Sequence, residues 1–425
     1  MKKRSFWQPL LILSIIIFSI FSQISPALAF TSFNDEQKLV LQAWRLVNQA
    51  YLDESFNNQD WWRVREKFSQ KTLENRQDAY LAIEEMLKTL DEPFTRLLRP
   101  DQYKNLQIST SGELSGIGLQ ITINPENQQL EVVSPLEGSP AKVAGIAPHD
   151  HILQIDGIDT TKMSLDEAAG KMRGTKGTTI SLTIQPKNQD QGIRTIQLVR
   201  DRIQLSPVIS NLDNQSSSLP IGYIRLTQFS ANATEELAKS IKELNSEGAK
   251  AYILDLRNNP GGLLQAGIDI ARLFLNEGVI VHTVNRQSIS ESYNANGTAL
   301  TKAPLAVLVN QGTASSSEVL AGALQDNGRA ILVGEKTYGK ALIQSLFELS
   351  DVINEEKAGL AVSVAKYQTP NHRDIHKLGI QPNIKIENEL ISTENKQPVD
   401  KQYQAAVKVL TNLDNLAHST ETKSS

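Results

Sequence analysis

Segments typical of strands and of helices alternate along residues 193–386, and this alternation limits the fold more than any other feature of the chain. Short apolar runs, each about the length of a buried strand, are separated by longer segments with apolar residues at helical spacing. The expected strands are residues 221–226, 251–256, 279–284, 305–309 and 330–333, and the expected helices are 233–245, 263–275 and 318–325. This order predicts a layered α/β core.

Residues 311–344 of this core are the segment best suited to catalysis. The chain leaves one predicted strand through a turn of small residues, forms a helix, and passes through a second strand before Lys340. A serine at the start of a helix suits acyl transfer, because free backbone N–H groups and the helix dipole favour negative charge there. A lysine can act as its base if a desolvated site keeps the amine neutral. Position alone leaves Ser315, Ser316 and Ser317 as candidate nucleophiles.

The spacing in this segment resembles that of the carboxyl-terminal-processing proteases, which are S41-type peptidases with a serine–lysine dyad and a PDZ domain. In that family the serine precedes the lysine by twenty-five residues, which implies Ser315 and Lys340 here. The family's acidic residue and glutamine correspond to Glu318 and Gln344. Ser315 with Glu318 is also a capping box, which starts helices in proteins of any function. The joint spacing of the four residues favours catalysis, and capping is compatible with it.

A second candidate site is the sequence D-L-R-N-N-P-G-G, which starts at Asp255 at the end of a predicted strand. Glycine N–H groups just before a helix can stabilise an oxyanion, although N-P-G-G is also simply a good turn. The resemblance implies an oxyanion hole formed by the N–H groups of Gly262 and Ser316. Asp255 and Arg257 are expected to organise this loop as buried residues without taking part in the chemistry.

Two positions depart from the family pattern. Ser316 stands where the family usually has alanine, and Ala341 follows the lysine where glycine is usual. The additional methyl group of Ala341 matters only if its backbone requires a positive φ.

Residues 106–190 resemble a PDZ domain, with short strands and two helical pieces. Gly116-Ile117-Gly118-Leu119 matches the loop with which such domains bind a C-terminal carboxylate. Glycines allow backbone N–H groups to converge on the carboxylate, and the following strand pairs with the peptide. Glycines also serve bulges and tight turns, so the loop motif depends on the surrounding strand and helix order.

The histidines leave other interpretations open. His149 and His151 lie in a predicted loop where related PDZ domains have Pro-Gly-Asp. Two interpretations stay open: the histidines sense pH, or they are exposed loop residues without a function. His372 and His376 are four residues apart, but a nearby proline and glycine indicate a loop, and the glutamate of an H-E-x-x-H zinc motif is missing. We therefore expect no metal and no other cofactor. No feature favours a Ser-His-Asp triad over Lys340.

Residues 1–29 have the features of an export signal, with a basic head, a mostly apolar run of twelve residues and an Ala-x-Ala cleavage site. A spanning helix needs roughly eighteen apolar residues, so an uncleaved anchor is the less favoured alternative. Residues 30–105 are expected to be a helical region, and D-E-P-F-T-R-L-L within it resembles a run in the family's N-terminal region. Residues 191–390 would be the peptidase core and 391–425 a C-terminal segment.

The formal charge of the chain is −4, and removal of the basic head would make it three units more negative. No basic run follows the signal, so nucleic acid is not expected as a partner. The chain contains no cysteine, which excludes disulfide bonds and a thiol nucleophile.

The resemblance implies an α/β (α+β) multidomain protein. Its core would be a ClpP/crotonase-like spiral of ββα units, with an inserted PDZ domain and a helical N-terminal region. The implied activity is that of a serine endopeptidase that recognises free, mostly apolar C-termini and removes C-terminal extensions in the thylakoid lumen or periplasm. The core most resembles the photosynthetic branch of the family, which processes a photosystem II reaction-centre subunit. A scaffold or chaperone that binds C-termini without cleaving them is the alternative.

Overall fold

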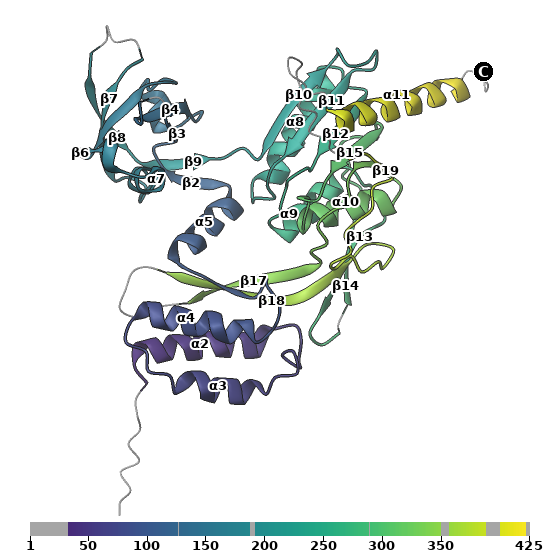
Figure 1. The fold of residues 1–425 in the computed structure, drawn as a ribbon. Helices are drawn as coiled ribbons and strands as arrows, with labels where there is room; N and C mark the ends of the chain where they lie inside the picture. The colour runs from purple at the N-terminus through teal and green to yellow at the C-terminus, as the bar shows by residue number, and fades with distance from the viewer. Residues whose placement is uncertain are drawn as a thin grey trace, which may run out of the picture.

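The computed structural model describes residues 33–125, 127–187, 192–288, 290–349, 357–387 and 400–421. The predicted export signal at 1–29 lies outside the described residues, as does much of the segment 391–425. Figure 1 shows a helical unit that follows the start of the described chain, a β-rich unit, and an α/β core joined to the helical unit by two long strands.

Within residues 33–95, the N-terminal region consists of the helices α2 (Asp35–Ala50), α3 (Trp61–Ser69) and α4 (Arg76–Lys88). Each begins after an asparagine or aspartate whose side chain accepts a backbone N–H of the first turn, which stabilises the helix start. Their buried apolar side chains pack together with those of β18 (Ala358–Gln368). One part of the region is not helical, because Arg96–Leu98 form the strand β1, which pairs with β18.

Helix α5 (Pro100–Ser111) leads into the β-rich unit. The strands of this unit are β2 (Glu113–Gly116), β3 (Leu119–Ile123), β4 (Leu130–Pro135), β5 (His151–Ile155), β6 (Ile158–Asp159), β7 (Thr179–Gln185), β8 (Arg194–Val199) and β9 (Asp201–Gln204). Its helices are α6 (Pro140–Val143), the 3-10 helix η1 (Thr160–Lys162) and α7 (Leu165–Met172). The main sheet has the order β3-β4-β5-β7-β8 around its own apolar core. β2 pairs with β9, so the chain enters and leaves the unit at one place.

The main sheet of the core has the order β10-β11-β12-β15-β16-β19. Its strands are β10 (Val208–Asp213), β11 (Ile221–Leu226), β12 (Ala251–Asp255), β15 (Leu305–Val309), β16 (Ile331–Gly334) and β19 (Ile384–Lys385). β10 is antiparallel to β11, and the remaining neighbours pair in parallel. The expected alternation of strand and helix therefore produces the predicted α/β layers.

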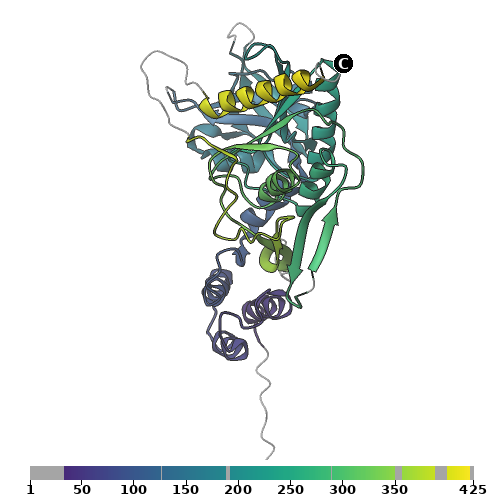
Figure 2. The ribbon, with the colours of Figure 1, turned by 90° about the vertical axis from the view of Figure 1, so that its right-hand side faces the viewer.

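Both faces of this sheet are covered, because side chains alternate along each strand. Tyr252 and Leu254 of β12 pack in the cluster that contains α8 (Ala233–Ser246), α9 (Leu264–Arg272) and α10 (Ser316–Asp326). Ala251 and Ile253 point to the opposite face, where α11 (Lys401–Glu421) packs. Figure 2 shows α11 lying across this second face.

A second sheet extends from the core to the helical region (Figure 1). Its order is β1-β18-β13-β14, with β17 (Leu342–Leu349) also paired to β18. β13 (Val279–Asn285) was expected from the sequence, but it pairs with β14 (Ser290–Asn294) and β18 and not with the main sheet. Strand β18 of this sheet contacts the start of α10, because the Tyr367 hydroxyl donates to the Ser315 carbonyl oxygen at 3.0 Å. The candidate site lies there.

Candidate active site

Ser315 lies between the end of β15 and the first residue of α10. Its backbone has φ 59° and ψ −122°, a sparsely populated conformation for a residue with a side chain. The Ser315 carbonyl oxygen accepts the N–H groups of Glu318, at 2.7 Å, and Val319, at 3.0 Å, so the helix begins directly at this strained residue. A sharp strand-to-helix turn of this kind presents a serine side chain away from the sheet.

Glu318 is fully buried, and its carboxylate joins the serine turn to the lysine loop. Oε2 accepts the backbone N–H of Ser315 at 3.0 Å and that of Lys340 at 2.9 Å. Oε1 accepts the Thr337 hydroxyl at 2.5 Å and the Gly339 N–H at 2.8 Å. These four donors offset the cost of burying the carboxylate. Glu318 therefore has a structural role in fixing where Ser315 and Lys340 lie relative to each other.

The Lys340 side chain is half-buried beside the Phe94 ring, whose centroid lies 4.8 Å from Nζ. Burial lowers the pKa of the Lys340 amine below its usual 10.5, and the nearby positive charge of Arg96 lowers it further. Glu92 and Glu318 act in the opposite direction, with smaller effects. The amine is thus biased toward the neutral form that a general base needs.

Tyr367 makes a second link between the two backbone segments. Its hydroxyl lies 2.6 Å from the Lys340 carbonyl oxygen and 3.0 Å from that of Ser315. Complete burial keeps the pKa of this phenol well above its usual value, so it remains a hydrogen-bond donor. Among the described atoms, no hydrogen bond joins the Ser315 hydroxyl to the Lys340 amine.

The glycine turn after β12 lies directly against Ser315. A Cβ on Gly261 would lie 2.8 Å from the Ser315 Cβ and 2.9 Å from the Ser316 nitrogen, so only glycine fits there. The Gly261 N–H already donates to the Asn259 side chain at 2.9 Å. Within the described chain, the N–H groups of Gly262 and Ser316 have no such acceptor, which suits the oxyanion role predicted for them.

The structure also explains both departures from the family pattern. The Ser316 hydroxyl donates to the Gly262 carbonyl oxygen at 3.0 Å and so ties the two predicted oxyanion residues together. Ala341 is buried without a positive φ, so its methyl group causes no backbone strain.

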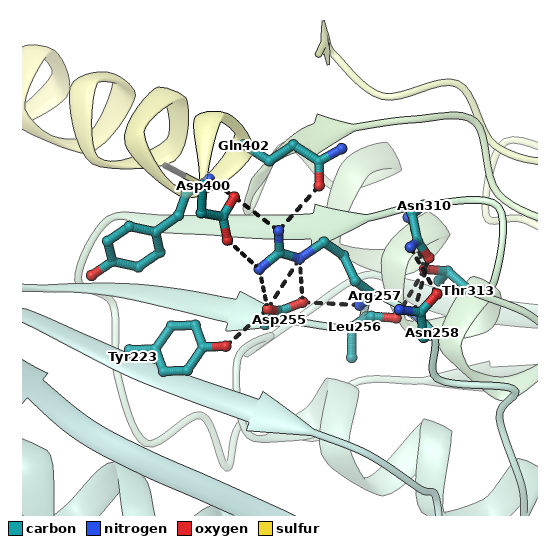
Figure 3. A network of polar contacts seen from close by, with 10 residues as sticks. Tyr223, Asp255, Leu256, Arg257, Asn258, Asn310, Thr313, Asp400 and Gln402 are labelled. Carbon is teal, nitrogen blue, oxygen red and sulfur yellow. Dashed lines mark hydrogen bonds and ion pairs between the residues drawn. The ribbon is translucent and has the colours of Figure 1, made fainter. Parts of the chain in front are cut away.

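Asp255 and Arg257 form the centre of a polar network at the end of β12 (Figure 3). Asp255 is wholly buried and forms an ion pair with Arg257 at 2.6 Å; the Tyr223 hydroxyl donates to the same carboxylate at 2.9 Å. Arg257 also pairs with Asp400 at 2.8 Å and donates to Gln402 at 3.2 Å. This geometry fits the expectation that Asp255 and Arg257 are buried residues with a structural role. The contribution of Asp400 and Gln402, at the start of α11, was not predicted from the sequence.

Gln344 lies on β17, and its amide NH₂ group donates to the Ser363 hydroxyl at 3.2 Å. Among the described contacts, Gln344 forms no hydrogen bond with the Lys340 amine. The Ser363 hydroxyl in turn donates to the Glu92 carboxylate, in the loop that also carries Phe94. Glu92 and Ser363 are 271 residues apart in the chain. The sequence did not predict that this loop of the N-terminal region belongs to the site. The run D-E-P-F-T-R-L-L, which contains the loop, was the one available signal.

In the β-rich unit, Gly116 ends β2, and Ile117 and Gly118 connect it to Leu119, the first residue of the edge strand β3. Gly118 has φ +73°, and a Cβ there would lie 2.3 Å from the Ser139 Cβ, so this position requires glycine. The Ile117 side chain is buried in the core of the unit. Within the described sheet, β3 pairs only with β4, which leaves its other edge available for an added peptide strand.

The two histidines of this unit meet at one carboxylate. His149 has φ 69°, and its Nδ1 lies 2.7 Å from Glu131 Oε1. His151 Nε2 lies 3.6 Å from Glu131 Oε2. The hydrogen bond from the Asn124 amide lowers the pKa of Glu131 most, and the contacts with the two histidines lower it further. His372 and His376 lie in a loop, and His372 stacks on His282 with ring centroids 4.0 Å apart.

Comparison with known proteins identifies the family. The model for peptidase family S41 matches residues 220–386, and the model for the PDZ domain matches residues 105–185. A carboxyl-terminal-processing protease of Synechocystis sp. is 62% identical over 393 residues, which cover 92% of this chain and 90% of that protein. The chain belongs to the carboxyl-terminal-processing proteases of family S41. It is therefore a serine peptidase with a PDZ domain, and it acts on protein substrates.

Further relatives come from chloroplasts. The chloroplastic carboxyl-terminal-processing peptidase 2 of Arabidopsis thaliana is 42% identical over 359 residues, which cover 82% of this chain and 68% of that protein. A solved structure of a photosystem II D1 C-terminal processing protease superposes with a TM-score of 0.54 and 38% sequence identity. That match covers 85% of this chain and 95% of the other. The predicted fold class and the resemblance to this family are confirmed, and membership favours the peptidase over a non-cleaving scaffold.

Proposed function

We propose that this peptidase cleaves with a Ser315–Lys340 dyad. The observation that carries the proposal is the Glu318 carboxylate, which accepts the backbone N–H groups of both residues and so fixes their segments together. The Ser315 hydroxyl oxygen attacks the scissile carbonyl, and the neutral Lys340 amine takes the hydroxyl proton. The resulting ammonium then protonates the leaving amine, and water hydrolyses the acyl-enzyme with Lys340 again acting as base.

The oxyanion of each tetrahedral intermediate would be held by the N–H groups of Gly262 and Ser316. Both N–H groups lack another acceptor within the described chain, and the Ser316 hydroxyl donates to the Gly262 carbonyl oxygen, so the two residues lie side by side. Gln344 would orient the lysine amine. Glu318 is a positioning residue in this scheme, because its carboxylate is already occupied by four donors.

We further propose that the PDZ domain selects substrates by their free, mostly apolar C-termini. The open edge of β3 offers pairing to an extended peptide, and the 116–119 loop precedes that edge. Backbone N–H groups converging there would bind the terminal carboxylate without help from a basic side chain in the loop.

The substrate we propose is the precursor of the photosystem II D1 subunit, whose C-terminal extension would be removed. The support is the similarity to a D1 C-terminal processing protease and to chloroplastic relatives. With the export signal expected at residues 1–29, the site of action would be the thylakoid lumen or the periplasm. No helix within the described ranges is long and apolar enough to span a membrane.

The test is cleavage of a synthetic peptide that contains the C-terminal region of the D1 precursor, followed by mass spectrometry. We expect one internal cut that releases the extension. Ser315→Ala should abolish the cut while the protein stays folded, whereas Ser316→Ala and Ser317→Ala should retain activity. An intact peptide with every variant and with the native protein would contradict the proposed substrate, and loss with Ser317→Ala alone would contradict the choice of nucleophile.

A further inference from the structure

The loop of residues 92–96 brings the N-terminal region into the active site. Its C-terminal end is fixed to the second sheet, because Arg96 begins the strand β1 that pairs with β18. The Phe94 ring faces the Lys340 amine at 4.8 Å, and Thr95 is buried. This loop therefore forms part of the wall around the amine that acts as base in the proposed mechanism.

The Glu92 carboxylate is the centre of this loop. Oε1 accepts the Phe94 N–H at 2.5 Å, and Oε2 accepts the Thr95 N–H at 2.9 Å and the Thr95 hydroxyl at 2.7 Å. Oε2 also accepts the hydroxyl of Ser363, at 2.9 Å. The Ser363 N–H donates to the Thr95 hydroxyl oxygen at 3.1 Å, so the strand and the loop hold each other at two points.

The direction of these bonds determines how the Gln344 amide is turned. A serine hydroxyl has one hydrogen to donate, and an ionised carboxylate can only accept. The hydrogen of the Ser363 hydroxyl is therefore committed to Glu92. The contact between Ser363 and Gln344 must then be donated by the amide NH₂ group, at 3.2 Å. Among the described residues no other donor bonds to the carbonyl oxygen of Gln344, which is therefore able to accept one.

This orientation matters because a neutral amine offers two hydrogens and one lone pair. Catalysis needs the lone pair to face the Ser315 hydroxyl. A carbonyl oxygen beside the amine accepts one of its hydrogens and leaves the lone pair free, whereas an NH₂ group in the same place would compete for the lone pair.

We propose that Glu92, acting through Ser363, fixes the Gln344 amide so that its carbonyl oxygen is the atom offered to Lys340. The inference rests on the proposed Ser315–Lys340 mechanism and deepens it. Glu92 and Ser363 are positioning residues in this scheme, since neither touches the substrate. One side of the catalytic arrangement is thus supplied by the N-terminal helical region.

The first test is a double-mutant cycle on the full-length mature protein with a cleavable peptide as substrate. Ser363→Ala should lower kcat roughly tenfold, the effect of one lost hydrogen bond, with little change in KM. In a Gln344→Ala background the same substitution should change kcat less than about twofold, because both act through one group. Ser240→Ala, at a buried serine on α8, is the matched control and should leave kcat unchanged.

The second test separates orientation from charge. Glu92→Gln removes a negative charge that raises the pKa of Lys340, so the acidic limb of the kcat/KM profile should move to lower pH. The new NH₂ group also faces the donors of Phe94, Thr95 and Ser363, so at least one of these hydrogen bonds is lost. The Gln344 amide is then held less firmly, and kcat should fall. Ser363→Ala keeps the charge and should move the limb less than Glu92→Gln does. If thermal unfolding shows that Ser363→Ala does not fold, Glu92→Gln in the Gln344→Ala background provides the same comparison.

Equal losses of kcat in the two backgrounds, or no loss with Ser363→Ala, would overturn this inference. So would a larger shift of the pH limb with Ser363→Ala than with Glu92→Gln. These outcomes leave the proposed dyad intact as long as Lys340→Ala is inactive. Activity in Lys340→Ala would instead remove the proposed mechanism itself, and the role of Gln344 with it.

Discussion

Glu318 accepts the backbone N–H of Lys340 at 2.9 Å, although twenty-two residues separate them in the chain. The same oxygen accepts the N–H of Ser315. One carboxylate thus positions the main chain of both proposed catalytic residues, and their side chains remain available for chemistry.

Glu318→Gln should therefore inactivate the enzyme and destabilise it. A glutamine of the same size turns an NH₂ group toward donors such as the Gly339 N–H and leaves at least one of them unsatisfied. We expect a loss of about 2–4 kcal/mol in the free energy of unfolding, measured by denaturant titration. The exposed Glu277 provides the control, since Glu277→Gln should change neither quantity. Full activity in Glu318→Gln would show that the carboxylate is not needed to place the dyad.

Tyr367→Phe removes the hydroxyl that lies near the carbonyl oxygens of Ser315 and Lys340. We expect kcat to fall by about tenfold and stability by about 1 kcal/mol, since one buried hydrogen bond is lost. Tyr252→Phe is a matched change at a buried tyrosine that bonds to Asn245 in the core. It should cost similar stability without lowering kcat. A similar kcat in both variants and the native protein would contradict the role of Tyr367.

Arg257→Ala should destabilise the core by about 3–5 kcal/mol, because it leaves the buried Asp255 carboxylate without its charged partner. Adding Asp255→Asn should recover part of this loss, since the remaining group is then neutral. Denaturant unfolding of the single and double variants measures the difference. Arg272→Ala removes a more exposed ion pair and should cost at most about 1 kcal/mol. Equal costs for Arg257→Ala and Arg272→Ala would mean that the network in Figure 3 adds little stability.

Amidation of a substrate's C-terminus should reduce its apparent affinity roughly ten- to hundredfold, the effect of losing a charge-assisted hydrogen bond. The comparison uses one unstructured peptide with a free or an amidated end. Acetylation of its N-terminus removes a charge at the other end and should have little effect. Equal cleavage of the free and amidated peptides would show that the PDZ domain does not recognise a carboxylate.

Some parts of the active site and of the fold could be predicted from the sequence, because they depend on residues close together in the chain. Ser315, Glu318 and Lys340 lie within one strand–helix–strand segment, so their spacing along the chain already limits their positions in space. The alternation of strands and helices likewise predicted the core layers, since side-chain periodicity is a local property.

Contacts made by distant segments could not be predicted in this way. Glu92 reaches Ser363 only because β1 pairs with β18, and a three-residue strand carries too little pattern to be recognised. Asp400 reaches Arg257 from the start of α11, 143 residues further along the chain. The placement of β13 outside the main sheet is a similar case, because an apolar strand does not specify its partner.

The pH dependence of cleavage, measured for the native enzyme, Lys340→Arg and Lys340→Ala, tests the central claim most directly. Burial lowers the pKa of Lys340, and only the deprotonated amine is a base, so native activity should rise as the pH passes upward through that lowered value. Arginine keeps its proton at every accessible pH, so Lys340→Arg should be as inactive as Lys340→Ala. An active Lys340→Arg enzyme with an unchanged pH profile would show that residue 340 supplies charge and not a base.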